Sequence, residues 1–105
     1  MSNQGNQKQL IGLISLRQLK AVKEIIEKDK NLNLNEISKY GTFPTMLATL
    51  TCDFEMLKLL VENGAQRSLK FKDRKDRTVF DEAKKCKNET MIKFIQKELN
   101  KLDQN

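Results

Sequence analysis

The sequence predicts an all-helical solenoid built from three stacked helix-pair repeats. The main observation is a recurrence: the run that begins at Ala21 returns from Met56 and again from Met91, each time 35 residues later, with apolar residues on apolar positions. A period of about 20–50 residues is typical of stacked units that share one core. The second observation is that apolar residues within each unit follow helical spacing. At 105 residues the chain has room for one small domain.

The first repeat is predicted as two helices, because its apolar residues form two stripes at helical spacing. The stripes are Leu10, Leu13 and Ile14, then Leu19, Val22, Ile25 and Ile26.

The second repeat carries clearer start and stop signals. Pro44 suits the first turn of a short helix, where a missing N–H costs nothing. Asp53 can cap a longer helix, which Asn63 and Gly64 end through a left-handed glycine. We predict Leu57 and Leu60 of this longer helix as central core positions.

The third repeat is predicted as a short helix around Val79, Phe80 and Ala83 and a longer one capped by Asn88. The buried stripe of the longer helix is Met91, Ile92, Ile95 and Leu99, and its lysines at four-residue spacing suit a solvated face: Lys93, Lys97 and Lys101.

The predicted domain covers residues 9–101. Its repeats span about 9–40, 41–75 and 76–101. Residues 1–8 and 102–105 are predicted as polar tails.

Positive charge gathers in one part of the chain. The net charge is +6, and residues 67–87 hold nine basic groups against four acids. Such a surface raises the local concentration of acidic partners and speeds their association. The alternative is a compositional habit without a partner, since Lys, Asn and Ile are frequent throughout.

Two cysteines and the chain's hydropathy bear on its location. Cys52 and Cys86 have no metal-ligand spacing, so we expect reduced thiols in similar loop positions, although a pair remains open. No apolar run is long enough to cross a bilayer, and no signal segment is recognisable. We therefore expect a cytoplasmic protein without membrane association; a nuclear location or delivery into a host cell stays open.

The second repeat closely resembles an ankyrin repeat. Its residues 41–48 read GTFPTMLA and residues 53–65 read DFEMLKLLVENGA, against the family's G-x-T-P-L-H-x-A-A and its L-E-V-V-x-L-L-L-x-x-G-A-D. Residues 76–83 with 88–95 resemble a third copy and residues 10–26 a first, so the resemblance covers about residues 9–99.

The sequence departs from the family pattern in three ways. Its period is 35 residues where 33 is usual, so we expect the loop 66–75 to project further than in the family. The Thr-Pro-Leu-His tetrapeptide is replaced by FPTM at 43–46 and TVFD at 78–81, so its steadying Thr–His hydrogen bond is absent and less regular hairpins are expected. The turn glycine is replaced by Cys52 and Lys87.

Ankyrin-repeat proteins bind other proteins through loop tips and the concave face of the first helix in each pair. The resemblance therefore implies a non-catalytic interaction module, acting as adaptor, inhibitor or effector. The matching contact positions are Lys39, Tyr40, Thr42, Met46, Leu50 and Thr51 in repeat 2, and Arg74, Lys75, Arg77, Asp81 and Lys85 in repeat 3. Tyr40 is the preferred anchor, because amphipathic aromatics are enriched at binding hot spots. Met46 and Leu50 could equally be core residues.

No enzymatic site is predicted. The chain has no histidine, no glycine-rich phosphate loop and no metal-ligand cluster, so neither cofactor nor metal is expected. Cys86 lies among lysines that could lower its pKa, but it lacks a base and an orienting group. The predicted partner is another protein, with an acidic or amphipathic segment, bound by a monomer. The alternative is nucleic acid or another polyanion on the basic region 67–87, against which stands the lack of a reader motif.

Overall fold

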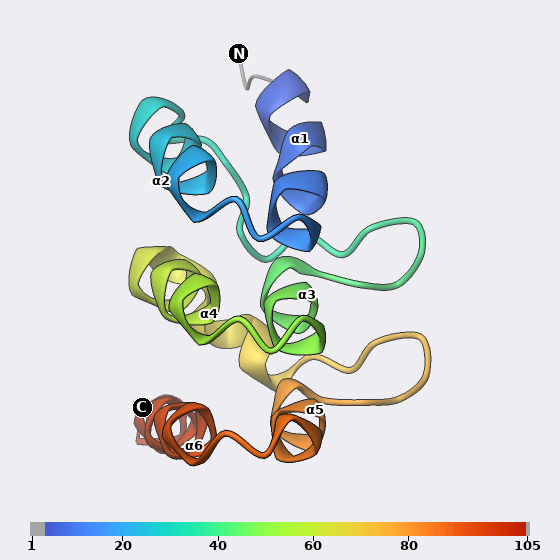
Figure 1. The fold of residues 1–105 in the computed structure, drawn as a ribbon, viewed down its shortest axis with the longest axis vertical. Coiled ribbons are helices and arrows are strands. Elements are labelled where there is room, and N and C mark those ends of the chain that lie inside the picture. The colour runs from blue at the N-terminus through green and yellow to red at the C-terminus, as the bar shows by residue number, and fades with distance from the viewer. Residues whose placement is uncertain (1–3, 105) are drawn as a thin grey trace.

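The computed structural model describes residues 4–104, and all regular structure among them is helical. Six α-helices form three consecutive pairs: α1 (Gln4–Ser15) with α2 (Leu19–Lys28), α3 (Pro44–Leu50) with α4 (Phe54–Leu60), and α5 (Val79–Cys86) with α6 (Glu89–Asp103). In Figure 1, α1, α3 and α5 lie in one column and α2, α4 and α6 in a second column beside it. α3 packs against both α1 and α5.

The 35-residue period of the sequence returns in the backbone. The second helices of the pairs begin at Leu19, Phe54 and Glu89, and two of the first helices begin at Pro44 and Val79. The turn inside each pair holds one residue in the left-handed region: Arg17 at φ 60°, Cys52 at φ 53° and Lys87 at φ 56°. The turn inside each helix pair thus adopts a left-handed conformation that glycine favours, without a glycine.

The predicted helix signals act as expected. Asp53 caps α4 by accepting a hydrogen bond from the Met56 N–H at 3.2 Å, and Asn88 caps α6 through the Met91 N–H at 3.1 Å. Pro44 opens α3. α4 runs on into a wider turn, η1 (Val61–Ala65), which leaves helical geometry at Gly64 with φ 115°.

The core lies between the two columns. Leu57 and Leu60 are fully buried, as predicted. The largest fully buried side chains around them are Leu10, Ile14, Phe43, Met46, Met56, Leu69, Met91 and Ile95. Phe54 of α4 meets Phe94 of α6 edge to face, with ring centroids 5.4 Å apart.

The expectation of a projecting loop over 66–75 is wrong for its first half. Residues Gln66–Lys70 form a short 3₁₀ helix, η2, in which Ser68 and Leu69 are buried. The Ser68 hydroxyl lies 2.7 Å from that of Thr45 in α3 and donates to the Ala65 carbonyl. Burial of Leu69 and these hydrogen bonds draw the segment onto the body, so only residues 71–78 project as a loop (Figure 1).

The segments predicted as tails are largely helical. α1 begins at Gln4, and Gln7 connects it to the loop after α2. The side-chain amide of Gln7 donates to the Asn33 carbonyl and accepts from the Asn33 N–H, each at 2.8 Å. α6 likewise continues to Asp103. The remaining tail residues, 1–3 and 105, lie outside the described part.

The two cysteines are paired, contrary to the prediction of reduced thiols. Cys52, in the turn between α3 and α4, forms a disulfide with Cys86 at the end of α5, with Cα atoms 5.7 Å apart. Equivalent turns in consecutive pairs lie side by side when the pairs stack, which brings residues 34 apart in sequence within bonding reach. Disulfides persist mainly in oxidising compartments. The bond therefore removes the reduced thiols as support for the predicted cytoplasmic location.

Candidate partner-binding groove

Two loop tips of the same shape project beside α3 and α5 (Figure 1). In the first, residues 38–42, the Ser38 N–H donates to the Thr42 carbonyl at 2.7 Å; in the second, residues 73–77, the Asp73 N–H donates to the Arg77 carbonyl at 3.0 Å. Each tip has one left-handed residue at the same place, Gly41 in the first and Asp76 in the second. The two tips are therefore copies of one turn, 35 residues apart.

The tips contact each other directly. The Arg74 guanidinium donates to the Lys39 carbonyl at 2.6 Å, and a Cβ built on Gly41 would lie 2.8 Å from the Arg74 Cβ. Gly41 also has a φ of +78°, which side-chain-bearing residues rarely adopt. Glycine is thus required here both for the turn and for the close approach of the tips.

An open groove of about 230 Å³ lies between the two tips and α3. It is lined by Tyr40, Gly41, Thr42, Leu47, Leu50, Asp73, Arg74, Lys75 and Arg77. Six of the eleven predicted contact residues are in this lining. Tyr40 is 68% exposed and Leu50 is 40% exposed, so neither is a core residue. Leu47 also lines the groove but was not predicted as a contact residue. Apolar residues at helical spacing do not reveal which of them lie in the core and which line a groove.

Met46 is a correction to the predicted contact set. Its side chain is fully buried in the core and is absent from the lining of the groove, although Leu50, one helical turn further along α3, lines it.

Arg77 lines the groove, but its charge is also used inside the protein. Its guanidinium forms ion pairs with Asp73 at 2.7 Å and with Glu82 of α5 at 3.0 Å. The side chains of Asp73 and Glu82 are only 5% and 7% exposed. Arg77 therefore links the second tip to α5, and the two carboxylates balance its positive charge.

This contact shifts the titration of both groups. Burial raises the pKa of the Asp73 carboxyl, but hydrogen bonds from the Arg77 side chain and from the N–H groups of Arg77 and Lys75 outweigh burial and leave that pKa below its ordinary value. The hydrogen bond to Asp73 in turn raises the pKa of Arg77. Both groups stay charged at neutral pH.

Three other predicted residues are not in the lining of the groove: Lys39, Thr51 and Lys85. Lys39 sits over the Tyr40 ring, with its Nζ 5.2 Å from the centroid. The Thr51 hydroxyl donates to the Leu47 and Ala48 carbonyls, so it serves the end of α3. Lys85 pairs with Glu82 at 3.2 Å.

Asp81 has a local role at the start of α5. Its carboxylate accepts from the Thr78 N–H at 3.1 Å, and the Thr78 hydroxyl accepts from the Asp81 N–H at 3.2 Å. This reciprocal cap holds the junction at which the family pattern uses a Thr–His hydrogen bond. The hydrogen bonds from Thr78 lower the pKa of Asp81.

Much of the basic region 67–87 is neutralised within the chain. Four of its nine basic groups are in ion pairs: Lys70 with Asp103, Lys72 with Asp76, Arg77 with Asp73 and Glu82, and Lys85 with Glu82. Lys84 lies over the Phe80 ring at 4.8 Å. Among the region's basic groups that have no ion pair with a described residue, Arg74 and Lys75 lie in the second tip, and the others are in η2, α5 and the turn before α6: Arg67, Lys84 and Lys87.

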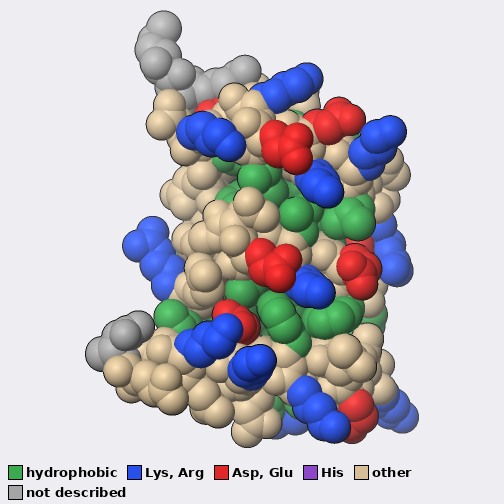
Figure 2. Space-filling view, turned by 90° about the vertical axis from the view of Figure 1, so that its left-hand side faces the viewer, with side chains coloured by type: hydrophobic (Ala, Val, Ile, Leu, Met, Phe, Trp, Pro, Cys, Tyr) green, Lys and Arg blue, Asp and Glu red, His purple; other side chains and the backbone are tan. Residues whose placement is uncertain are grey.

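The opposite face is electrically mixed. Figure 2 shows the surface of α2, α4 and α6, where basic and acidic side chains are interspersed with apolar patches. A shallow groove of about 190 Å³ there is lined by two lysines, two glutamates and two leucines: Lys23, Lys58, Glu55, Glu62, Leu19 and Leu59. Its charges balance, so it offers no preference for the sign of a partner.

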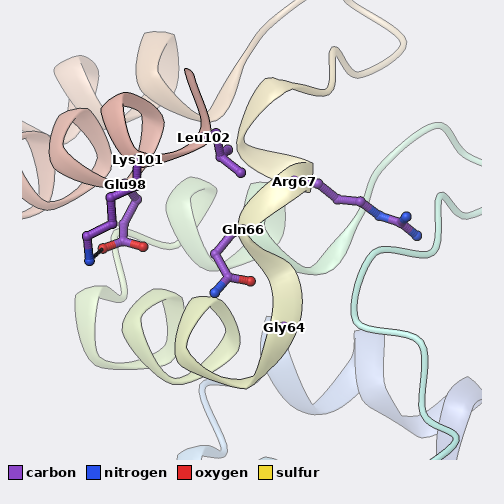
Figure 3. Close-up of a pocket in the computed structure, with 6 residues that line it drawn as sticks. All are labelled: Gly64, Gln66, Arg67, Glu98, Lys101 and Leu102. Atoms are coloured by element: carbon purple, nitrogen blue, oxygen red, sulfur yellow. Dashed lines mark hydrogen bonds and ion pairs between the residues drawn. The ribbon is translucent and has the colours of Figure 1, made fainter. Parts of the chain in front are cut away.

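A larger hollow of about 370 Å³ lies beside the end of α6 (Figure 3). Its polar groups do not converge: Arg67 points away from Glu98 and Lys101, which pair with each other at 2.9 Å. A ligand site needs several polar groups aimed at one point, and this hollow has none.

Cys86 is bound in the disulfide and is not a free thiol, so the nucleophile considered for it is not present in this state. Across residues 4–104, no group of three or more acidic or cysteine side chains could hold a metal ion. No helix of that range is long and apolar enough to cross a membrane.

Comparison with known proteins adds no assignment. No protein-family model matches the chain, and a search of curated proteins finds no match either.

Proposed function

We propose that this chain is a three-repeat protein of the ankyrin type and a non-catalytic interaction module. The observation that carries the proposal is the groove: two turns with the same hydrogen bond, 35 residues apart, lie against each other, and six of the eleven predicted contact residues line the open groove between them and α3. The repeated helix starts and the repeated left-handed turn residues support the repeat architecture.

The exposed residues of the groove are those that interfaces favour. Tyr40 brings a large apolar ring with a polar end, and Arg74 brings a planar guanidinium already fixed by its hydrogen bond to Lys39. Tyr and Arg are enriched at binding hot spots, and fixed side chains lose less entropy on binding. The groove is therefore the surface of choice for a protein partner.

Polyanion binding is the less supported function. It would draw on the whole basic region, but four of its nine basic groups are paired within the chain. A single exposed aromatic, Tyr40, lines the groove, whereas single-stranded nucleic acids stack on several.

The proposal is tested by capturing partners from the native cell and then measuring direct binding of a captured protein to purified variants. We expect Lys39→Ala with Tyr40→Ala to weaken binding at least about tenfold while the melting temperature stays nearly unchanged, because both side chains are exposed. The matched control is Lys93→Ala with Lys97→Ala on the exposed side of α6, which should bind like the wild type.

Equal binding by the tip variant and the wild type would place the contact elsewhere. A tip variant that loses binding and also unfolds at lower temperature would make Tyr40 a packing residue and remove it from the proposed interface.

A further inference from the structure

The size of the groove limits what can fill it. At about 230 Å³ and open to solvent, it is below the roughly 300–1,000 Å³ of sites that enclose small molecules. It can hold one side chain of a larger partner, with the rest of the partner lying over the rim.

The floor of the groove is apolar. Leu47 and Leu50 of α3 line it, and the Tyr40 ring forms one wall. Leu50 and Tyr40 leave 40% and 68% of their surface in water, so an apolar side chain inserted between them removes apolar area from solvent on both sides.

The rim of the groove carries positive charge without a competing carboxylate. Asp73 is the one acid in the lining, and its oxygens are taken by Arg77 and by the N–H groups of Lys75 and Arg77. Arg74 and Lys75 are exposed and have no acidic partner in the described part of the chain. Arg74 is also held in place by the Lys39 carbonyl.

We propose that the groove recognises an acidic protein segment that inserts one aliphatic or aromatic side chain between Tyr40 and Leu50. Carboxylates flanking that side chain pair with Arg74 and Lys75, since a guanidinium binds a carboxylate with two parallel hydrogen bonds. This inference rests on the proposed function and names the chemistry of its partner.

The probe is a short synthetic peptide with one leucine between two runs of glutamate, measured by fluorescence anisotropy at low and high salt. We expect saturable binding by the wild type, and a loss of at least about tenfold when serine replaces the central leucine, because the apolar contact is removed. A peptide with lysine in place of glutamate should not bind.

The matched variants separate the groove from general electrostatics. Arg74→Ala with Lys75→Ala should weaken the glutamate peptide about tenfold or more and flatten its salt dependence. Lys93→Ala with Lys97→Ala removes the same charge from α6 and should leave binding within about twofold of the wild type. Leu50→Ser, at an exposed position, should match the loss seen with the serine peptide.

Three outcomes would overturn the inference. If the leucine and serine peptides bind equally, no apolar side chain is anchored in the groove. If Arg74→Ala with Lys75→Ala and Lys93→Ala with Lys97→Ala lose the same affinity, the attraction is non-specific. An oligothymidine that binds at the tips with the same dependence on Arg74 and Lys75, and displaces the peptide, makes the surface a polyanion site.

A random peptide display selection on the folded chain distinguishes failure of the acidic-segment inference from failure of the proposed interaction module. Selected peptides that are neutral or basic, yet depend on Tyr40, would overturn the acidic partner and keep the interaction module. Selected peptides that bind the tip variants as well as the wild type would overturn both.

Discussion

Gly41 is the residue on which the geometry of the groove depends most directly. It combines a φ of +78° with a backbone that lies against Arg74. Its counterpart in the second tip is Asp76, which holds a similar left-handed angle and is exposed. The same turn thus tolerates a side chain where it faces water and excludes one where the two tips meet.

Gly41→Ala should lower the free energy of unfolding by about 1–3 kcal/mol, since it adds both backbone strain and a clash. Chemical denaturation at neutral pH measures this loss. Gly12→Ala is a matched control, because nothing lies within 4 Å of a Cβ at Gly12 in α1, and there alanine should be neutral or slightly stabilising. Equal effects of the two substitutions would mean that the tips do not meet at Gly41.

Asp73 links the stability of the second tip to pH. Its folded pKa is below the unfolded value of about 3.9, so its contribution is fully present above that unfolded value and is lost as the pH falls through the folded pKa. The difference in unfolding free energy between wild type and Asp73→Asn should therefore be constant near neutral pH and shrink below about pH 4. Urea titrations over that range measure it, and a difference that did not change with pH would show that the Asp73 carboxylate contributes no charge-dependent stability.

Among the secondary-structure elements, the second tip is linked to α5 by a network of ion pairs. Arg77 lies between Asp73 of the tip and Glu82 of the helix, and Lys85 closes the chain on Glu82. Among the described residues, the first tip has no ion pair; there the Ser38 hydroxyl accepts hydrogen bonds from the Tyr40 and Thr42 N–H groups. The same turn is thus stabilised by ion pairs in one repeat and by a serine in the other.

Arg77→Ala should lower the unfolding free energy by about 1–3 kcal/mol, because it leaves two nearly buried carboxylates without their shared partner. The guanidinium is itself 27% exposed, so solvent screening keeps the loss below that of a fully buried pair. Thermal melts of this variant should differ clearly from those of Arg67→Ala, which removes an exposed arginine from η2. Identical melts would show that the network is not stabilising.

In the molecule as a whole, a covalent bond joins the second helix pair to the third. The disulfide between Cys52 and Cys86 closes a loop with a sequence separation of 34 and joins the ends of α3 and α5. Stacks of few repeats have few interfaces between them, so one cross-link contributes a large share of their stability.

Reduction of this disulfide should lower the free energy of unfolding by about 2–4 kcal/mol. Denaturation with and without a reductant measures the effect, and Cys52→Ser with Cys86→Ser serves as the control, since its midpoint should not respond to reductant. A wild-type midpoint equally insensitive to reductant would mean that the two thiols are not paired in solution.

The helices of the second and third pairs and their 35-residue period were predictable from local sequence. Pro44, Asp53, Gly64 and Asn88 act through local backbone geometry, so their effect could be predicted without knowledge of any distant contact. The core positions Leu57 and Leu60 followed from helical spacing in the middle repeat.

Which side chains line the groove and which are used inside the protein depends on contacts between residues distant in sequence. Met46 and Leu47 are adjacent apolar residues of one helix, and their separation into core and groove depends on where the neighbouring tip lies. Arg74 and Arg77 are equally basic in sequence and both line the groove, but Arg74 has no acidic partner among the described residues, while Arg77 is held between Asp73 and Glu82. The pairing of Cys52 with Cys86 likewise needs the stacking of two repeats. Local signals set dihedral angles, whereas partners distant in sequence are chosen by packing, and packing decided the candidate site.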